Sequence, residues 1–216
     1  MRPPPSSHDR MNLLSGILQS QRAYVYSGML LAASFGFFAY AHFSKFQETR
    51  EWALLLVVIS ETLTAGFFIL RSNPKTVSLA PSDWLVAIAA SFAPLFLRPA
   101  TWGIFPPASI AIAFGTMLQI ASLLSLNRSF AIVAAKREIK TAWMYRIVRH
   151  PLYASYFLVF GGYVLVHTTL ANLLVYVMTV GFLCVRIFRE ERHLAFDPAY
   201  RAYMLEVRHR LVPFVF

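Results

Sequence analysis

Charged residues and cysteine are both scarce in this chain of 216 residues. Charged side chains make up 14% of the sequence, whereas an average soluble domain has about 25%. Hydrophobic residues make up 57%, and the mean hydropathy is +0.55. This shortage of charge, together with several long apolar runs, excludes an ordinary water-soluble domain and predicts a membrane protein. The single cysteine, Cys184, excludes a disulfide framework and a thiolate metal site.

Other features of known sites are also missing from the sequence. The six histidines include no i, i+4 pair and have no cysteine nearby, so we expect no metal. No glycine-rich phosphate loop is present; Gly161-Gly162 and Gly115 lie inside apolar runs and predict close helix packing. No basic arm separates from the apolar segments, so we expect no nucleic-acid partner.

The apolar runs predict an all-α polytopic membrane protein with about six transmembrane helices. The last two form a tight helical hairpin, 151–188, and an amphipathic C-terminal segment follows them. We expect Pro94 to kink the third span, and we expect the polar residues Ser44–Glu51 to form a link between the first two spans. The predicted spans are Tyr24–Phe43, Trp52–Leu70, Trp84–Leu97, Ala108–Leu126, Pro151–Val166 and Leu170–Phe188.

The chain divides into three regions by composition. Residues 1–22 are polar, proline-rich and then mildly amphipathic, which predicts an interfacial N-terminal segment. Residues 23–126 form a four-helix transmembrane housing, and residues 127–216 contain most of the polar motifs. With a cytoplasmic N-terminus, 17 of the 20 Lys and Arg lie on the cytoplasmic side, as the positive-inside rule requires. We therefore expect both termini in the cytoplasm, contact with anionic lipid headgroups, and, for so compact a chain, a bacterial inner membrane.

Two polar clusters flank the predicted hairpin. The first is Arg149-His150-Pro151-Leu152-Tyr153, with Pro151 at the first helical position and His150 at the N-cap. The second is Glu190-Glu191 at the exit of the last span. A hairpin returns the chain to the side that it left, so both clusters should meet at one membrane face. Either cluster can equally be an ordinary interfacial belt or charged collar, in which Arg149 binds lipid headgroups.

Glu61 lies near the middle of the second span, where an ionised carboxylate is costly. One interpretation is a functional group that shapes an acceptor tunnel. The other is a protonated side chain that is hydrogen-bonded to Ser60, Thr62 or Gln119. Both stay open from the sequence.

The order of motifs in the last third of the chain resembles the isoprenylcysteine carboxyl methyltransferase family, which is related to phospholipid N-methyltransferases. The motifs are Arg-His-Pro-x-Tyr, a tight hairpin, Glu-Glu-x-x-Leu, and Tyr-x-x-Tyr before a basic stretch that ends at Pro213. The family pattern has glycine where this chain has Asn127, and often glycine at Ser155. Asp197-Pro198 replaces a Phe-Gly-type turn.

The resemblance implies a cytoplasm-facing site for S-adenosylmethionine. It assigns cofactor contacts to His150, Pro151, Tyr153, Glu190, Glu191, Tyr200, Tyr203 and Arg210. It implies catalytic roles for Arg128, Glu190 and Arg208. Arg128 or Arg208 would hold a carboxylate acceptor, whereas Glu190 or Glu191 would take the proton of an amine acceptor.

The function that we expect is methyl transfer to a lipophilic or small membrane-soluble acceptor, with a carboxylate favoured. A phospholipid amine or a thiol is the alternative acceptor. Two other classes stay open, a small-solute membrane carrier and a nicotinamide-dependent membrane reductase of similar architecture. The sequence does not distinguish between oligomeric states.

Overall fold

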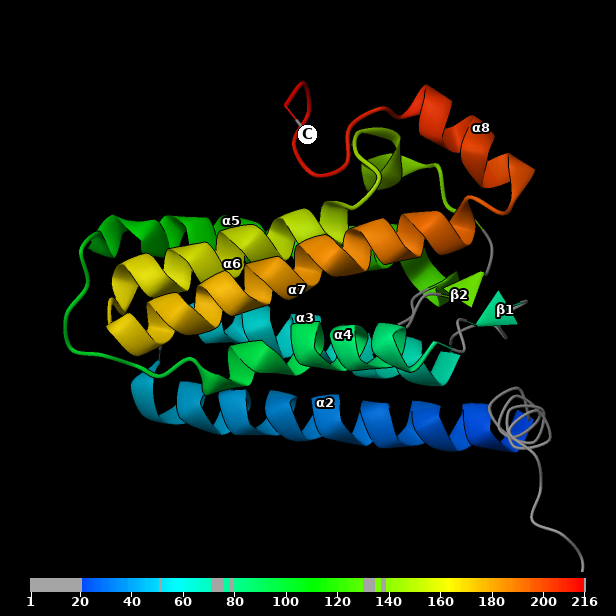
Figure 1. Ribbon diagram of the computed structural model, residues 1–216. Helices are drawn as coiled ribbons and strands as arrows, with labels where there is room; N and C mark the ends of the chain where they lie inside the picture. The colour runs from blue at the N-terminus through cyan, green and yellow to red at the C-terminus, as the bar shows by residue number, and fades with distance from the viewer. Residues whose placement is uncertain are drawn as a thin grey trace, which may run out of the picture.

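The computed structural model describes residues 21–50, 52–70, 76–77, 80–129, 135–136 and 139–215. These residues form a bundle of long helices that lie side by side, with a short helix at one end (Figure 1). The α-helices are α2 (Gln21–Thr49), α3 (Trp52–Leu70), α4 (Pro81–Phe92), α5 (Ser109–Leu126), α6 (Pro151–Val166), α7 (Leu170–Leu194) and α8 (Pro198–Glu206). The 3-10 helices are η1 (Ala93–Phe96), η2 (Pro106–Ala108), η3 (Asn127–Ser129) and η4 (Trp143–Arg146).

The long helices pack mainly in pairs. The most extensive contacts join α2 to α3, α5 to α6 and α4 to α7, and α3 also packs on α5. In Figure 1, α2 lies along one flank, α5, α6 and α7 lie on the other, and α3 and α4 lie between them. The α6–α7 hairpin is therefore supported by α5 on one side and by α4 on the other.

All six predicted apolar segments are helical, and the bounds predicted for α3 and α6 match the structure. The expected link Ser44–Glu51 is wrong over most of its length, because α2 continues to Thr49. Those residues contain no glycine or proline, and an ion pair between Lys45 and Glu48 (2.9 Å) supports the extra turn. Pro94 has the expected effect, since α4 ends at Phe92 and the chain continues as the 3-10 helix η1.

In the part of the chain that the structure describes, two helices are long and apolar enough to cross a membrane, Pro106–Leu126 and Leu170–Leu194. Only 22% of the most apolar part of each is buried within the bundle, so most of that surface faces outward. Apolar surface of this extent is the surface that a lipid environment covers, and we therefore describe the chain as a membrane protein. The apolar helices Leu54–Leu70, Pro81–Phe96 and Pro151–Val166 are shorter. Six crossings and a cytoplasmic N-terminus stay predictions, and the expected N-terminal segment 1–22 lies almost entirely outside the described residues.

A small strand pair was missed by the all-α prediction. β1 (Thr76–Val77) pairs antiparallel with β2 (Ala135–Lys136), which joins the segment after α3 to the segment after α5. Strands of two residues are too short to show a period in the sequence. The pairing places both segments at the end of the bundle where α7 finishes (Figure 1).

Glycine allows α5 and α6 to pack closely, as the sequence predicts. A Cβ atom on Gly115 would lie 2.9 Å from Val159 Cγ2, and one on Gly162 would lie 2.9 Å from the backbone oxygen of Ala108. Gly161 faces another neighbour, Tyr176 of α7, whose Oη would lie 3.0 Å from an added Cβ. The glycines of α6 therefore set its distance from both neighbouring helices.

The closed end of the hairpin is fixed by buried polar contacts. Asn172 is almost fully buried; its Nδ2 donates to the carbonyls of Arg98 (2.8 Å) and His167 (2.7 Å), and its Oδ1 accepts from the Arg98 N–H (3.0 Å). The Thr169 hydroxyl caps α7 by accepting from the Asn172 N–H (3.0 Å). Because these bonds fix the turn, they also set the register in which α6 and α7 run to the other end of the bundle.

We predict that Gly162→Ala lowers the stability of the folded bundle by about 1–3 kcal/mol, the usual cost of overpacking. The added methyl group meets the backbone oxygen of Ala108, which cannot rotate away as a side chain can. Thermal unfolding of the detergent-solubilised protein, followed by circular dichroism, measures the change.

Gly181→Ala is the matched control, because the space around Gly181 in α7 is open within 4 Å. Alanine is favoured over glycine inside a helix by about 1 kcal/mol, so this variant should be as stable as the original or more stable. Equal melting temperatures for the two variants would contradict the close contact at Gly162.

Candidate functional site

The hairpin brings the two predicted polar clusters together at one end of the bundle. His150 occupies the N-cap position of α6 and Pro151 its first position, as the sequence predicts. Glu190 and Glu191 lie in the last turns of α7 and contact the start of α6 through side-chain hydrogen bonds. The expected meeting of the two clusters is therefore confirmed.

A buried carboxylate, Glu191, lies at the centre of this site. Arg149 Nε donates to Glu191 Oε1 (2.7 Å), and Arg210 Nε donates to Glu191 Oε2 (2.9 Å). His150 Nε2 lies 3.1 Å from Oε1. The side chains of Arg149, His150 and Glu191 are each 5% exposed, so these groups are held away from water. Both carboxylate oxygens are thus engaged by groups of the protein itself.

Residues 207–210, which we call the strap, pass over the start of α6. Arg149 Nη1 donates to the carbonyls of Val207 (2.8 Å) and Arg208 (2.9 Å). The backbone N–H of Arg149 donates to the His209 carbonyl (2.9 Å), and that of His150 donates to the Arg210 carbonyl (2.8 Å). Arg149 therefore ties the strap to Glu191 through one guanidinium group.

The neighbouring carboxylate, Glu190, has different surroundings. It is half-buried, and Tyr153 Oη donates to its Oε2 (2.6 Å). The Tyr153 ring stacks on the His150 ring with centroids 5.4 Å apart, and the Arg186 guanidinium lies 5.1 Å from the Tyr153 centroid. Tyr153 is therefore held from both sides and fixes the position of Glu190.

Helix α8 supports the strap from outside. Asp197 caps it by accepting from the Ala199 N–H (3.1 Å), and Pro198 takes the first helical position, so the Asp-Pro pair is a helix start. Tyr200 and Tyr203 are buried with Val207, and Tyr203 Oη donates to the Tyr145 carbonyl (2.6 Å). Burial raises the pKa of Tyr200 and of Tyr203 above the ordinary value, so both hydroxyls stay protonated.

The structure gathers most of the residues that the resemblance assigns to the site. His150, Pro151, Tyr153, Glu190, Glu191 and Arg210 lie together, while Tyr200 and Tyr203 pack in the adjoining small core. Arg208 contributes its carbonyl oxygen, and its side chain is exposed. Arg128 lies in η3, but its side chain falls outside what the structure describes.

Sequence reasoning missed the role of Arg149, for which it offered only a lipid-headgroup contact. The available signal was its place beside His150 in the first motif. The sequence also predicts ion pairing within α7, because Arg189 and Arg192 flank the two glutamates and Arg186 lies four residues before Glu190. Instead Arg189 pairs with Asp83 of α4 (2.8 Å), and Arg186 Nη1 donates to Ser91 Oγ of α4 (3.2 Å).

Glu61 also has a partner that was not expected. Its Oε2 lies 2.9 Å from His42 Nδ1 of α2, whereas Ser60, Thr62 and Gln119 were the candidates. Ser60 Oγ is buried, and within the described part of the chain it has no hydrogen-bond partner. The pair lies between α2 and α3, and its proposed part in an acceptor tunnel stays a prediction.

We predict that Arg149→Ala releases the strap and strongly destabilises this end of the bundle. Removing one partner of a buried ion pair costs about 3–5 kcal/mol, because the other charge is left buried. The backbone N–H groups of residues 149 and 150 donate to carbonyls of the strap. Their hydrogen-exchange rates should therefore rise markedly in this variant.

Arg192→Ala serves as the control, because Arg192 follows Glu191 on α7 but is exposed. Its removal should leave the exchange of both amides unchanged. Protection that persists in Arg149→Ala would show that the strap is held without the guanidinium group.

Comparison with known proteins supports a methyltransferase resemblance. Residues 104–197 match the family model described as phospholipid methyltransferase. The match covers α5, α6 and α7 with Arg149, His150, Glu190 and Glu191, and it ends before α8 and the strap. No curated protein matches the chain. The family found is related to the isoprenylcysteine family that the motifs resemble, but it differs in the acceptor that its name gives. Phospholipid methyltransferases use S-adenosylmethionine as their methyl donor.

Proposed function

We propose that this chain is a membrane methyltransferase that transfers a methyl group from S-adenosylmethionine to the amine of a phospholipid headgroup. The matched family supports a lipid acceptor. The observation that carries the proposal is the difference between the two adjacent carboxylates. Glu191 has both oxygens bound by Arg149, His150 and Arg210. Glu190 accepts from Tyr153 through Oε2, and among the described residues its Oε1 has no hydrogen-bond partner.

The residues at the site fit S-adenosylmethionine by their chemistry. Glu190 can accept hydrogen bonds from an ammonium group or from ribose hydroxyls. Arg210, whose side chain is 29% exposed, suits a carboxylate, as does the start of α6, where the first backbone N–H groups have no helical acceptor. Bound there, S-adenosylmethionine supplies a methyl group that is activated by its positively charged sulfur.

An amine acceptor must lose a proton before its nitrogen can act as a nucleophile. In this proposal Glu190 accepts that proton through Oε1, while Tyr153 holds the carboxylate through Oε2. Tyr200 and Tyr203 do not serve as bases, because burial keeps their hydroxyls protonated. Glu190 is thus the catalytic base, and Tyr153 is a positioning residue.

Glu191 and Arg149 have a supporting role in this proposal. Their ion pair fixes the strap over the start of α6 and so excludes water from one side of the site. Exclusion of water favours alignment of two reactants and strengthens electrostatic interactions. Both residues therefore act through the strap and need no direct contact with the acceptor.

A carboxylate acceptor, which the sequence favoured, has less support. It needs a cationic partner such as Arg128 or Arg208. The side chain of Arg208 is exposed, and its backbone carbonyl is the group that contributes to the site. The phospholipid amine is therefore the acceptor that we propose.

The test is incorporation of a labelled methyl group into lipids by the purified protein in bilayer discs. We expect methylation of lipids with an amine headgroup and none of the same lipids after acetylation of the amine. Glu190→Gln should lower kcat about 10²–10⁴-fold, the usual contribution of a general base. Its dissociation constant for the methyl donor, measured by calorimetry, should change much less than kcat.

Glu206→Gln is the matched control, because Glu206 is an exposed carboxylate at the end of α8. It should keep full activity. Tyr153→Phe should lower kcat less than Glu190→Gln and shift the pH profile, since it removes the hydrogen bond that holds Glu190. Donor binding without methylation of any amine lipid would refute the proposed acceptor.

A further inference from the structure

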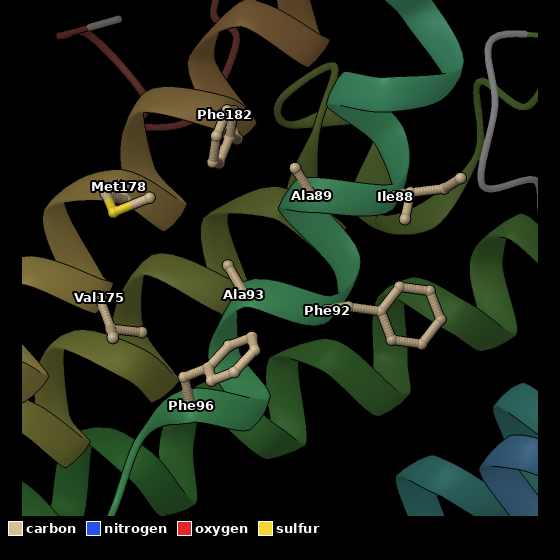
Figure 2. A pocket seen from close by; sticks show the side chains of 8 residues that line it. All are labelled: Ile88, Ala89, Phe92, Ala93, Phe96, Val175, Met178 and Phe182. Atoms are coloured by element: carbon tan, nitrogen blue, oxygen red, sulfur yellow. The ribbon is translucent and has the colours of Figure 1, made fainter.

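A groove runs along the surface between α4 with η1 and α7, at some distance from the polar site. Its volume is about 430 Å³, within the range of ~300–1,000 Å³ typical of pockets that hold small ligands. Figure 2 shows the side chains of both helices around it. The lining is apolar throughout: Ile88, Ala89, Phe92, Ala93, Phe96, Val175, Met178 and Phe182.

The groove is connected to the polar site along α7. Phe182 lines the groove and also packs against the buried cluster of Tyr153, Leu183 and Ile187. One turn further along α7, Arg186 lies over the Tyr153 ring, and Tyr153 bonds Glu190. An unbroken series of contacts therefore leads from the end of the groove to the proposed base.

Two arginines of α7 lie near the end of the groove that is closest to the polar site. Arg186 donates to Ser91 and Arg189 pairs with Asp83, so both arginines of α7 contact α4 near this end of the groove. The guanidinium groups of these arginines complement an anionic phosphate, while Glu190 further along α7 complements a cationic amine.

We propose that the groove between α4 and α7 binds an acyl chain of the acceptor phospholipid, with its phosphate beside Arg186 and Arg189. This inference rests on the proposed function, and it names where the acceptor binds. A hydrocarbon chain has no polar group to satisfy, so it suits an apolar lining. A peptide strand would leave its backbone N–H and C=O groups unsatisfied in such surroundings.

The first measurement is the dependence of activity on acyl-chain length at constant headgroup. For the original protein, KM should fall as the chain is lengthened until the groove is filled. Ala89→Phe places a large ring in the groove and should raise KM for long-chain acceptors about tenfold or more. Its kcat and its dissociation constant for the methyl donor should stay unchanged.

Ala41→Phe is the matched control, because Ala41 is exposed on α2, outside the groove. It should behave like the original protein for every chain length. The same KM for Ala89→Phe and Ala41→Phe with long-chain acceptors would overturn the groove and leave the proposed function intact.

The second measurement does not depend on turnover. A phospholipid with a photoreactive group in its acyl chain should label peptides from α4, η1 and the middle of α7. Excess unlabelled phospholipid should compete, and Ala89→Phe should remove the labelling. Labelling spread evenly over all outward apolar faces would mean ordinary bilayer contact and would overturn the inference.

The two measurements also separate this inference from the proposed function. Labelling confined to the groove in a protein that methylates no amine lipid would refute the proposed function, while it would support the groove as a phospholipid-chain site. Methylation that is independent of chain length, together with even labelling, would support the proposed function and overturn the groove as a site for the acyl chain.

Discussion

The site depends on one buried carboxylate, Glu191. Moving an ion out of water costs several kcal/mol, and the attraction of a partner offsets this cost only if the geometry is good and the remaining oxygens are bonded. Here the partners come from two parts of the chain besides α7. Arg149 and His150 precede α6, and Arg210 lies in the strap. An ionised Glu191 therefore requires the start of α6, the end of α7 and the strap to meet, and the hairpin turn, the close α5–α6 contact and the cap of α8 all hold them in position.

Helical geometry explains why two adjacent glutamates have different surroundings. Successive residues of an α-helix are rotated by about 100° around its axis, as 3.6 residues per turn require. Glu191 faces the buried arginine and histidine, whereas Glu190 faces the Tyr153 hydroxyl on the side of α6. Both oxygens of Glu191 are bonded within the protein, whereas Glu190 is half-buried and, among the described residues, hydrogen-bonded to Tyr153 alone. The pair thus provides a rigid support and a group that can accept a proton, from two consecutive positions.

Much of this arrangement follows from the sequence, because apolar runs define helices and a short turn between two of them forces their outer ends together. The bounds of α3 and α6, the N-cap at His150 and the meeting of the two motifs could all be predicted in this way. The remaining contacts join residues that are far apart in the chain, and local sequence patterns do not predict such contacts. Arg149 reaches the strap 58 residues later, Arg189 pairs with Asp83 rather than within α7, and Glu61 meets His42 of α2. The continuation of α2 to Thr49 was missed for a different reason, since polarity was taken to mean a loop where no residue breaks the helix.

The order of features along α7 matches the order of groups in a phospholipid. Apolar groove residues run from Val175 to Phe182, two arginines follow, and Glu190 comes last. A rise of 1.5 Å per residue makes the length from Val175 to Glu190 about 22 Å. Half of a bilayer of ~40–45 Å, headgroups included, has nearly the same thickness. A lipid that lies along α7 can therefore keep its chain at its normal depth, its phosphate beside the arginines and its amine level with the carboxylate. On this reasoning the acceptor reaches Glu190 without leaving its leaflet, so the protein need not supply the cost of extracting a lipid from the membrane.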